Sequence, residues 1–183
     1  MVGNIHLVIG GIRSGKSDYS ELLAKNNQNQ VLYVATGKNT DEHMIERIQK
    51  HQQKRPLNWE TLEEPSLLST ALLSFFSEKS LPSTILIDSL DFWISNRLID
   101  YPNSTYEQHE SWLTSQVNEL IKTCQNNCRN TIIVTSEVGA SLVSEHAIGR
   151  RFQDLLGTIN QIVSKASNTV DYVIAGNILN LKS

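Results

Sequence analysis

The segment GGIRSGKS, at residues 10–17, carries residue types that hold phosphate groups. It fits the pattern G-x-x-x-x-G-K-[ST], with an apolar run before it and a helical pattern after it. In such a loop glycines let backbone N–H groups point at phosphate oxygens, lysine reaches the β and γ phosphates, and the serine hydroxyl binds Mg²⁺. The alternative is a glycine-rich turn with an accidental lysine. We expect a nucleoside triphosphate site formed by Gly10, Gly11, Ile12, Arg13, Ser14, Gly15, Lys16 and Ser17.

A phosphate-binding loop needs a carboxylate to complete its magnesium site, usually at the end of another strand. Asp88 closes the apolar run TILID and is the first candidate, and Asp91 lies close enough in sequence to serve instead. Asp171 and Glu137 also fall near the ends of expected strands and have weaker claims. The alternative for Asp88 is that it only caps a helix. We expect Ser17 and Asp88 to be the Mg²⁺ ligands.

A histidine in the segment DEHMIERIQKHQQKRP, residues 41–56, is a second candidate centre. The spacing predicts a helix with Met44 and Ile48 on its apolar face, and His51 lies along that face. A neutral imidazole between cations such as Lys50 and Arg55 can accept a phosphoryl or nucleotidyl group. Spacing alone, however, favours a histidine that merely ends a helix, where the dipole stabilises its charged form.

Short apolar runs alternate with helical patterns along the chain. Each run is apolar on both faces, as in a parallel strand covered by helices. Together with the phosphate-binding loop, this alternation predicts one P-loop NTPase-like, RecA-like α/β domain over residues 1–183, with a doubly wound, mostly parallel sheet and helices on both faces. Its ligands would bind at the carboxyl ends of the strands. Strands are expected at 5–10, 31–36, 84–88, 131–136 and 170–176, and helices at about 16–26, 41–53, 66–78, 89–99, 106–126 and 149–167.

The composition restricts the class of partner. A net charge of -3 without a basic stripe argues against nucleic acid and favours small molecules or copies of the chain. The amino-terminal residues lack the features of a secretory signal, and no run of eighteen apolar residues occurs, so we expect a cytoplasmic protein without membrane insertion. Cys124 and Cys128 have no histidine within a dozen residues and are expected to be structural rather than zinc ligands.

Six segments together resemble a known family. They are GGIRSGKS, VLYVATG, RIQKHQQKRPLNWETLEEP, DSLDFWISNRL, VTSEVG and RRFQDLLGTINQ. Their order and approximate spacing are similar to those of the bifunctional adenosylcobinamide kinase / adenosylcobinamide-phosphate guanylyltransferase family of cobalamin biosynthesis. The resemblance implies phosphorylation of the aminopropanol hydroxyl of adenosylcobinamide with ATP or GTP. It then implies transfer of GMP from GTP to that phosphate, which gives adenosylcobinamide-GDP and pyrophosphate.

The resemblance also changes the interpretation of the histidine. In the family the second step passes through a guanylylated histidine in the motif R-I-x-x-H-x-x-x-R-P, which here is Arg47, Ile48, His51, Arg55 and Pro56. It makes His51 and Lys16 the catalytic residues: His51 would attack the α-phosphorus of GTP, and pyrophosphate would leave against Mg²⁺, Lys16 and the loop amides. It further implies a homotrimer with shared sites. The nucleotide contacts that we expect outside the loop are Thr36, Gly37, Lys38, Gln52, Gln53, Lys54, Arg55, Glu63 and Asp88.

Two residues depart from the family pattern. Ser136 replaces the asparagine of N-E-V-G, and Asp91 replaces the threonine of L-T-x-W. Either change would alter the corrinoid or metal environment. Two other functions stay open from the sequence. One is a P-loop kinase of another small-molecule alcohol or nucleotide, with His51 structural; the other is a nucleotide-dependent switch without transfer chemistry.

Overall fold

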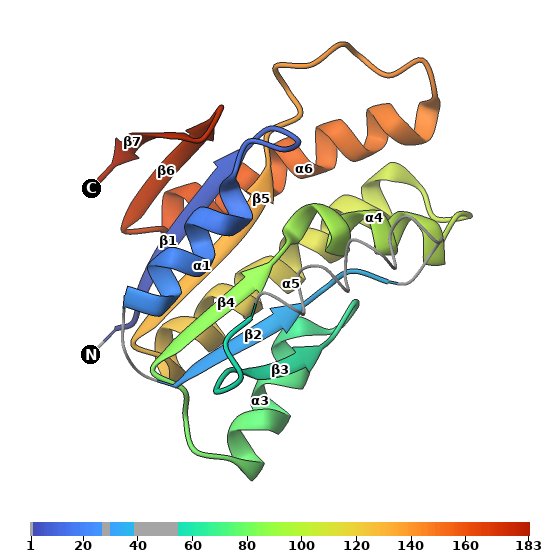
Figure 1. Cartoon of the computed structure of the whole chain (residues 1–183). Helices are drawn as coiled ribbons and strands as arrows, with labels where there is room; N and C mark the ends of the chain where they lie inside the picture. Colours follow the sequence, from blue (N-terminus) through green and yellow to red (C-terminus); the bar gives the residue numbers. More distant parts are fainter. Residues whose placement is uncertain (1, 27–29, 39–54) are drawn as a thin grey trace.

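The computed structural model describes residues 2–26, 30–38 and 55–183, and a single seven-stranded sheet runs through it (Figure 1). The strand order is β3-β2-β4-β5-β1-β6-β7. All neighbouring strands are parallel except β6 and β7, which are antiparallel. The predicted doubly wound, mostly parallel α/β fold is therefore confirmed. The strands are β1 (Asn4–Gly10), β2 (Val31–Ala35), β3 (Glu60–Glu63), β4 (Thr84–Asp88), β5 (Asn130–Ser136), β6 (Thr169–Ile174) and β7 (Asn177–Lys182).

Two of these strands, β3 and β7, were not predicted. The five predicted strands are largely buried, and their apolar runs identify them. In β3 only Leu62 is partly buried, and every residue of β7 is exposed, so neither has the hydrophobic pattern of a covered strand. Both lie at the edges of the sheet, where one side of the strand has no neighbour and a strong apolar pattern is not required.

The described helices lie on both faces of the sheet, as predicted (Figure 1). Helix α1 packs over β1, β4 and β5 on one face, and the other four cover the opposite face, where Leu90, Trp93, Leu113 and Leu156 belong to the larger buried cluster. The helices are α1 (Lys16–Asn26), α3 (Leu68–Glu78), α4 (Leu90–Asp100), α5 (Tyr106–Asn127) and α6 (Ala147–Ala166). The expected helix at 41–53 lies outside the described residues. Within the described ranges, the helices are too short or too polar to cross a bilayer.

Local signals fix where the helices begin and pack. Helix α5 starts with a capping box, in which the side chains of Thr105 and Gln108 each accept a hydrogen bond from the other residue's backbone N–H.

Three titratable side chains of α5 and the turn after it are buried. His109 is one of them, and burial lowers its pKa. Cys124 and Cys128 are free and buried, and burial raises the pKa of Cys124 to about 12. Such a thiol stays protonated and packs as an apolar group, as expected for a structural cysteine.

The carboxylate of Asp171 joins four elements. Asp171 lies near the amino end of β6, opposite Val8 of β1, and not at the carboxyl end of the strand, where ligands bind. Its Oδ2 accepts the hydroxyl of Tyr19 in α1 at 2.7 Å and lies 2.7 Å from Nε2 of His6, and its Oδ1 accepts the amide of Asn180 in β7 at 2.9 Å. This carboxylate holds the strands beside the phosphate-binding loop and is not a candidate metal ligand.

Acid should remove the contribution of Asp171 to stability. Burial opposes its ionisation, but hydrogen bonds from Tyr19, Asn180 and His6 outweigh burial, so the pKa of Asp171 is lowered. A lowered pKa stabilises the folded chain above the unfolded pKa of about 3.9, and this stabilisation is lost as the pH falls through the folded value. We expect Asp171→Asn to reduce the free energy of unfolding at pH 7 by about 1–3 kcal/mol, and the difference from wild type to shrink below pH about 4.

Denaturant titrations between pH 3 and pH 7 measure this difference. Glu119→Gln, at an exposed position of α5, is the matched control and should change stability by less than about 0.5 kcal/mol. A difference between Asp171→Asn and wild type that stays constant down to pH 3 would contradict the expectation.

Candidate functional site

Residues 10–17 form a tight loop between the carboxyl end of β1 and the start of α1. A side chain at Gly10 would place its Cβ 2.4 Å from the carbonyl oxygen of Val173 and 2.7 Å from Oγ of Ser14. Gly15 has φ +96°, a backbone conformation that residues with side chains rarely adopt. The two glycines of the motif are therefore required by space and by backbone geometry. Neighbouring backbone also supports the loop, because Glu137 N donates to Gly10 O at 3.0 Å and Gly176 N donates to Ser14 O at 2.9 Å.

Lys16 is the first residue of α1, and its side chain folds back over the loop. Only 7% of its surface is exposed, and its Nζ donates to the carbonyl oxygen of Gly11 at 3.2 Å. The buried hydroxyl of Ser14 has no hydrogen-bond partner among the described residues. An ammonium group, a buried hydroxyl and the amino end of a helix thus converge on one loop. This combination favours an anionic ligand, and phosphate is the typical one.

Asp88 ends β4 at the carboxyl ends of the parallel strands, where β1 also ends, and only β5 lies between β4 and β1. Its Oδ2 accepts the hydroxyl of Tyr33 at 2.7 Å. The guanidinium carbon of Arg55 lies 3.5 Å from the centre of the Tyr33 ring, and Trp59 stacks on that ring from a centroid distance of 6.5 Å. Burial, followed by the charge of Asp88, raises the pKa of Tyr33 well above its ordinary value. Tyr33 therefore remains a hydrogen-bond donor that orients the Asp88 carboxylate.

The available oxygen ligands suit Mg²⁺. Ser17 supplies a hydroxyl in the first turn of α1, and Asp88 supplies a carboxylate at the adjoining strand end. Mg²⁺ is usually held by one or two protein oxygens together with water and substrate phosphates. The described residues contain no cluster of three or more His, Cys, Asp or Glu side chains that could hold a metal by themselves. This set fits an ion that arrives with a nucleotide.

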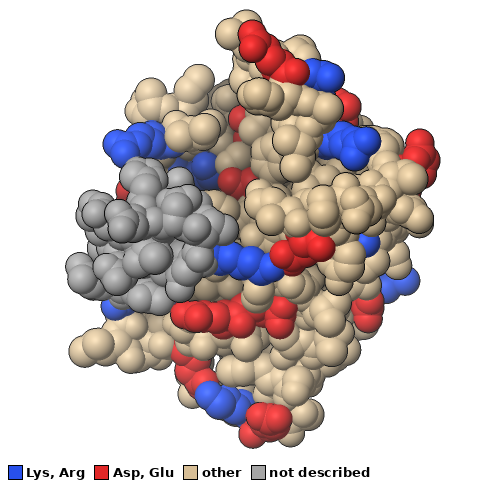
Figure 2. All heavy atoms as spheres, turned by 90° about the vertical axis from the view of Figure 1, so that its right-hand side faces the viewer, with Lys and Arg blue, Asp and Glu red and all other residues tan. Residues whose placement is uncertain are grey.

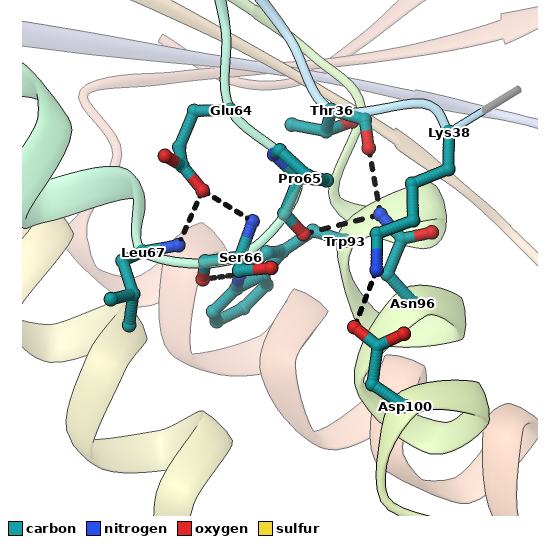
Figure 3. Close-up of polar contacts among 9 residues, drawn as sticks. All are labelled: Thr36, Lys38, Glu64, Pro65, Ser66, Leu67, Trp93, Asn96 and Asp100. Atoms are coloured by element: carbon teal, nitrogen blue, oxygen red, sulfur yellow. Dashed lines mark hydrogen bonds and ion pairs between the residues drawn. The ribbon is translucent and has the colours of Figure 1, made fainter.

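The expected nucleotide contacts beyond the loop begin at the end of β2. Thr36 is fully buried, and its Oγ1 both donates to Ser89 O and accepts from Ser89 N, each at 2.7 Å. Its carbonyl oxygen accepts the side-chain amide of Asn96 at 2.7 Å (Figure 3). These bonds occupy the polar side chain of Thr36 within the protein. Gly37 and Lys38 are partly exposed, and Lys38 pairs with Asp100.

The other expected site residues lie near the carboxyl ends of the strands, in the phosphate-binding loop, or outside the described residues. Glu63 is exposed at the end of β3, directly opposite Ala35 in the register of β2. Arg55 lies against Tyr33, as described above. Arg13 and Ile12 are exposed at the tip of the phosphate-binding loop. His51, Gln52, Gln53 and Lys54 lie outside the described residues.

Sequence reasoning missed Tyr33 and Asn96. Tyr33 is hidden within the apolar run VLYVAT, where it reads as one more strand residue. Asn96 left a detectable signal, because it is a polar residue among the buried positions of α4, where it accompanies Leu90, Trp93 and Ile94. A buried amide needs hydrogen-bond partners, so this position could have been singled out.

The two residues that depart from the family pattern touch each other. Ser136 Oγ donates to Asp91 Oδ2 at 2.7 Å. Ser136 also lies opposite Gly10 in the register of β1 and β5, so this bond lies beside the root of the phosphate-binding loop. Asp91 Oδ1 is buried and has no hydrogen-bond partner among the described residues. Asp91 therefore resembles Asp88, because in each carboxylate one oxygen accepts a hydroxyl of the protein.

The Ser136–Asp91 bond should appear as a coupling in a double-mutant cycle. Ser136→Ala leaves the Asp91 carboxylate without its donor and should cost about 1–3 kcal/mol of unfolding free energy. Asp91→Ala should cost less when Ser136 is already alanine, with a coupling of about 1 kcal/mol or more. Chemical denaturation of the four proteins measures it. The exposed pair Gln116 and Glu119, joined at 3.3 Å, is the control and should show almost no coupling, and a Ser136–Asp91 coupling as small would refute the expectation.

The surface at this side of the molecule carries both charges. Figure 2 faces the side toward which the strands of Figure 1 point, and basic and acidic side chains are interspersed among neutral ones over the described part of it. The described part of this face therefore presents no broad field of one sign.

Comparison with known proteins places the chain. It is 33% identical over 176 residues to the bifunctional adenosylcobalamin biosynthesis protein CobU of Escherichia coli (strain K12), an alignment that covers 93% of this chain and 95% of the relative. It is 33% identical over 178 residues to the bifunctional adenosylcobalamin biosynthesis protein CobP of Pseudomonas aeruginosa, with 96% of each chain covered.

Solved structures show the same fold at much lower identity. The RadB recombinase superposes with a TM-score of 0.51 and 12% identity, covering 93% of this chain and 74% of that one. A protein from Pyrococcus horikoshii OT3 superposes with a TM-score of 0.58 and 12% identity, covering 100% of this chain and 87% of that one. These likenesses confirm the predicted P-loop NTPase-like fold. A family model described as "Cobinamide kinase / cobinamide phosphate guanyltransferase" matches residues 6–181, and the chain belongs to this family of enzymes.

Proposed function

We propose that this enzyme phosphorylates adenosylcobinamide with ATP or GTP and then transfers GMP from GTP to the product through a guanylylated His51. The contact of Arg55 with Tyr33 is the observation that carries the proposal. Arg55 belongs to the R-I-x-x-H-x-x-x-R-P motif, and Tyr33 donates to Asp88 at the edge that holds the phosphate-binding loop. The end of the histidine motif and the candidate magnesium carboxylate therefore share one buried tyrosine.

In the kinase step the substrate hydroxyl oxygen attacks the γ-phosphorus of the nucleotide. The bond between the γ-phosphorus and the oxygen that bridges it to the β-phosphorus breaks, and the hydroxyl proton is released. The backbone N–H groups of residues 10–17 and the Lys16 ammonium bind the phosphates and offset their negative charge. Ser17 and Asp88 would hold Mg²⁺, which would supply further positive charge beside the phosphates. Lys16 reaches a phosphate by exchanging its bond to Gly11 O for one to the ligand.

In the guanylyl step a neutral imidazole nitrogen of His51 attacks the α-phosphorus of GTP. A P–N bond forms, the bond from the α-phosphorus to the bridging oxygen breaks, and pyrophosphate leaves toward the positive loop. A phosphate oxygen of adenosylcobinamide phosphate then attacks the same phosphorus. This attack breaks the P–N bond, frees His51 and yields adenosylcobinamide-GDP.

Several further assignments belong to this proposal. Gly37, Lys38 and Glu63 lie at the ends of adjacent strands, and this supports contacts of all three with the nucleotide, whereas Thr36 would act through its position. Gln52, Gln53, Lys54 and Arg55 flank His51 in the motif and would bind the same nucleotide. A cytoplasmic homotrimer with shared sites, in which corrinoid and nucleotide are small-molecule substrates, is part of the same proposal.

Label from the α-phosphate of GTP should remain on the protein as a phosphoramidate. We expect the wild type to hold an acid-labile, base-stable label, His51→Ala to hold none, and His146→Ala, at an exposed histidine before α6, to match the wild type. Gel autoradiography after acid and base treatment measures the label. Equal labelling of wild type and His51→Ala would exclude this residue as the acceptor, and an unlabelled wild type would exclude the covalent step.

Removal of the loop ammonium tests whether both steps use the phosphate-binding loop. We expect Lys16→Ala to lower both the kinase rate and the guanylylation rate by about 10²–10³, because both steps place negative charge in the loop. Lys25→Ala, in the last turn of α1, is the matched control and should change neither rate by more than about twofold. In a P-loop kinase with a structural His51, Lys16→Ala would abolish transfer of the γ-phosphate and His51→Ala would leave every activity intact.

A further inference from the structure

We infer that Asn96 is a positioning residue for guanylyl transfer, because its side chain holds the exit of β2, which leads into the His51 segment, together with the exit of the neighbouring strand β3. The inference rests on the proposed function. It assigns to α4 a task separate from that of the phosphate-binding loop: keeping the exits of β2 and β3 in place.

One amide group serves both strand exits. Asn96 is 5% exposed, and its Nδ2 donates to Thr36 O at 2.7 Å and to Pro65 O at 3.1 Å (Figure 3). Thr36 follows β2 and Pro65 follows soon after β3, and these strands are adjacent and parallel, with Ala35 opposite Glu63. An NH₂ group has two protons, and both are used. Loss of this amide therefore removes one hydrogen bond from each exit.

Two other side chains on the same face of α4 also bind the residues that follow β2 and β3. Trp93, three residues before Asn96, donates from Nε1 to Ser66 O at 2.8 Å. Asp100, four residues after Asn96, pairs with Lys38. Residues at these spacings share one face of a helix, and Figure 3 shows all three side chains directed at the two segments. We call Trp93, Asn96 and Asp100 the α4 clamp.

The second segment is also closed on itself. Glu64 Oε1 accepts the backbone N–H groups of Ser66 and Leu67 at 2.7 and 2.8 Å (Figure 3). Glu64 N donates to Ala35 O at 2.9 Å. Residues 64–67 therefore form a rigid turn that Asn96 can hold from one point. Because Glu63 immediately precedes this turn, its position at the end of β3 depends on the clamp.

The α4 clamp contacts residues that lie next to the His51 segment in the sequence. The clamp holds residues 36–38, which directly precede the His51 segment, and residues 65–66, which follow β3, the strand that the chain enters after that segment. Transfer to a histidine requires the nucleotide's α-phosphorus and the imidazole in a narrow range of positions, and a displacement of about 1 Å can cost about 10²-fold in rate. The kinase step uses no residue of that segment in the proposed mechanism, so the two steps should respond differently.

A second buried asparagine supplies a matched control. Asn160 of α6 is 8% exposed, and its Nδ2 donates to Ser136 O at 3.0 Å. It therefore holds the exit of β5, which lies beside the phosphate-binding loop, with the same chemistry that Asn96 applies to β2 and β3. A defect common to any lost strand-end bond should appear in both variants, whereas a defect specific to the His51 segment should appear only at Asn96.

The test compares Asn96→Asp, Asn96→Leu and Asn160→Asp with the wild type in the full chain. Asn96→Asp keeps the shape but turns an acceptor toward two carbonyl oxygens, and Asn96→Leu removes the donors without adding charge. Single-turnover guanylylation by GTP and steady-state phosphorylation of adenosylcobinamide by ATP are measured on each protein, with KM and kcat separated. Hydrogen exchange of residues 36–38 and 64–67 is followed without ligand.

We expect both Asn96 variants to lower the ratio of the guanylylation rate to the kinase kcat at least tenfold, mainly through the rate and not through the KM for ATP. Their backbone amides at residues 36–38, 64, 66 and 67 should exchange faster. Asn160→Asp should leave this ratio within about threefold of the wild-type value. Equal losses in both steps, an equal change of the ratio in Asn160→Asp, or unchanged exchange in the two segments would overturn the inference.

Failure of the proposed function gives a different result. If the wild type itself takes up no α-label, the guanylyl step is wrong, and the role of Asn96 in it is overturned as well. If the wild type is labelled normally and only the ratio fails to change, the proposed function stands and the positioning role alone is wrong.

Discussion

Backbone carbonyl groups at the ends of parallel strands need hydrogen-bond donors where the ladder of sheet hydrogen bonds stops. This requirement determines how the structure is built at the carboxyl ends of the strands. A buried carbonyl without a partner costs free energy comparable to a lost hydrogen bond. In this protein the donors come from different elements. Asn96 of α4 serves the exits of β2 and β3, Asn160 of α6 serves the exit of β5, and Glu137 N serves Gly10 at the end of β1.

Helices that pack against the sheet therefore also determine where each loop starts. Because the loops carry the candidate chemistry, the packing of α4 and α6 is linked to the site through single amide groups. On the opposite face, Tyr33 connects the same edge to Arg55 and Asp88 through a ring contact and a hydroxyl. The site lies between two layers of helices, and the buried polar side chains that support it come from β2, whose Tyr33 contacts a carboxylate, and from α4, whose Asn96 contacts backbone.

Much of the fold and the phosphate-binding loop could be predicted because their signals are local. The apolar runs mark buried strands, and Gly15 and Lys16 belong to a pattern whose mechanism is contained in eight residues. The exposed edge strands β3 and β7 carry no comparable pattern. The roles of Tyr33, Asn96 and Asp171 depend on which distant carbonyls and carboxylates the fold brings near them, and spacing along the chain does not contain that information. Thr36 is another residue whose contacts could not be predicted from spacing. Its hydroxyl suggests a ligand contact, but in the structure it forms hydrogen bonds with the backbone of Ser89.

The support of the phosphate-binding loop also has a consequence for synthesis of the protein. The loop emerges early from the ribosome, but its tight packing depends on β6 and the turn after it: Val173 lies against Gly10, Gly176 N binds Ser14 O, and Asp171 holds Tyr19 from 152 residues farther along the chain. A nascent chain that already contains the complete motif therefore lacks these contacts. The packing of the loop is therefore complete only after β6 has been translated and added beside β1.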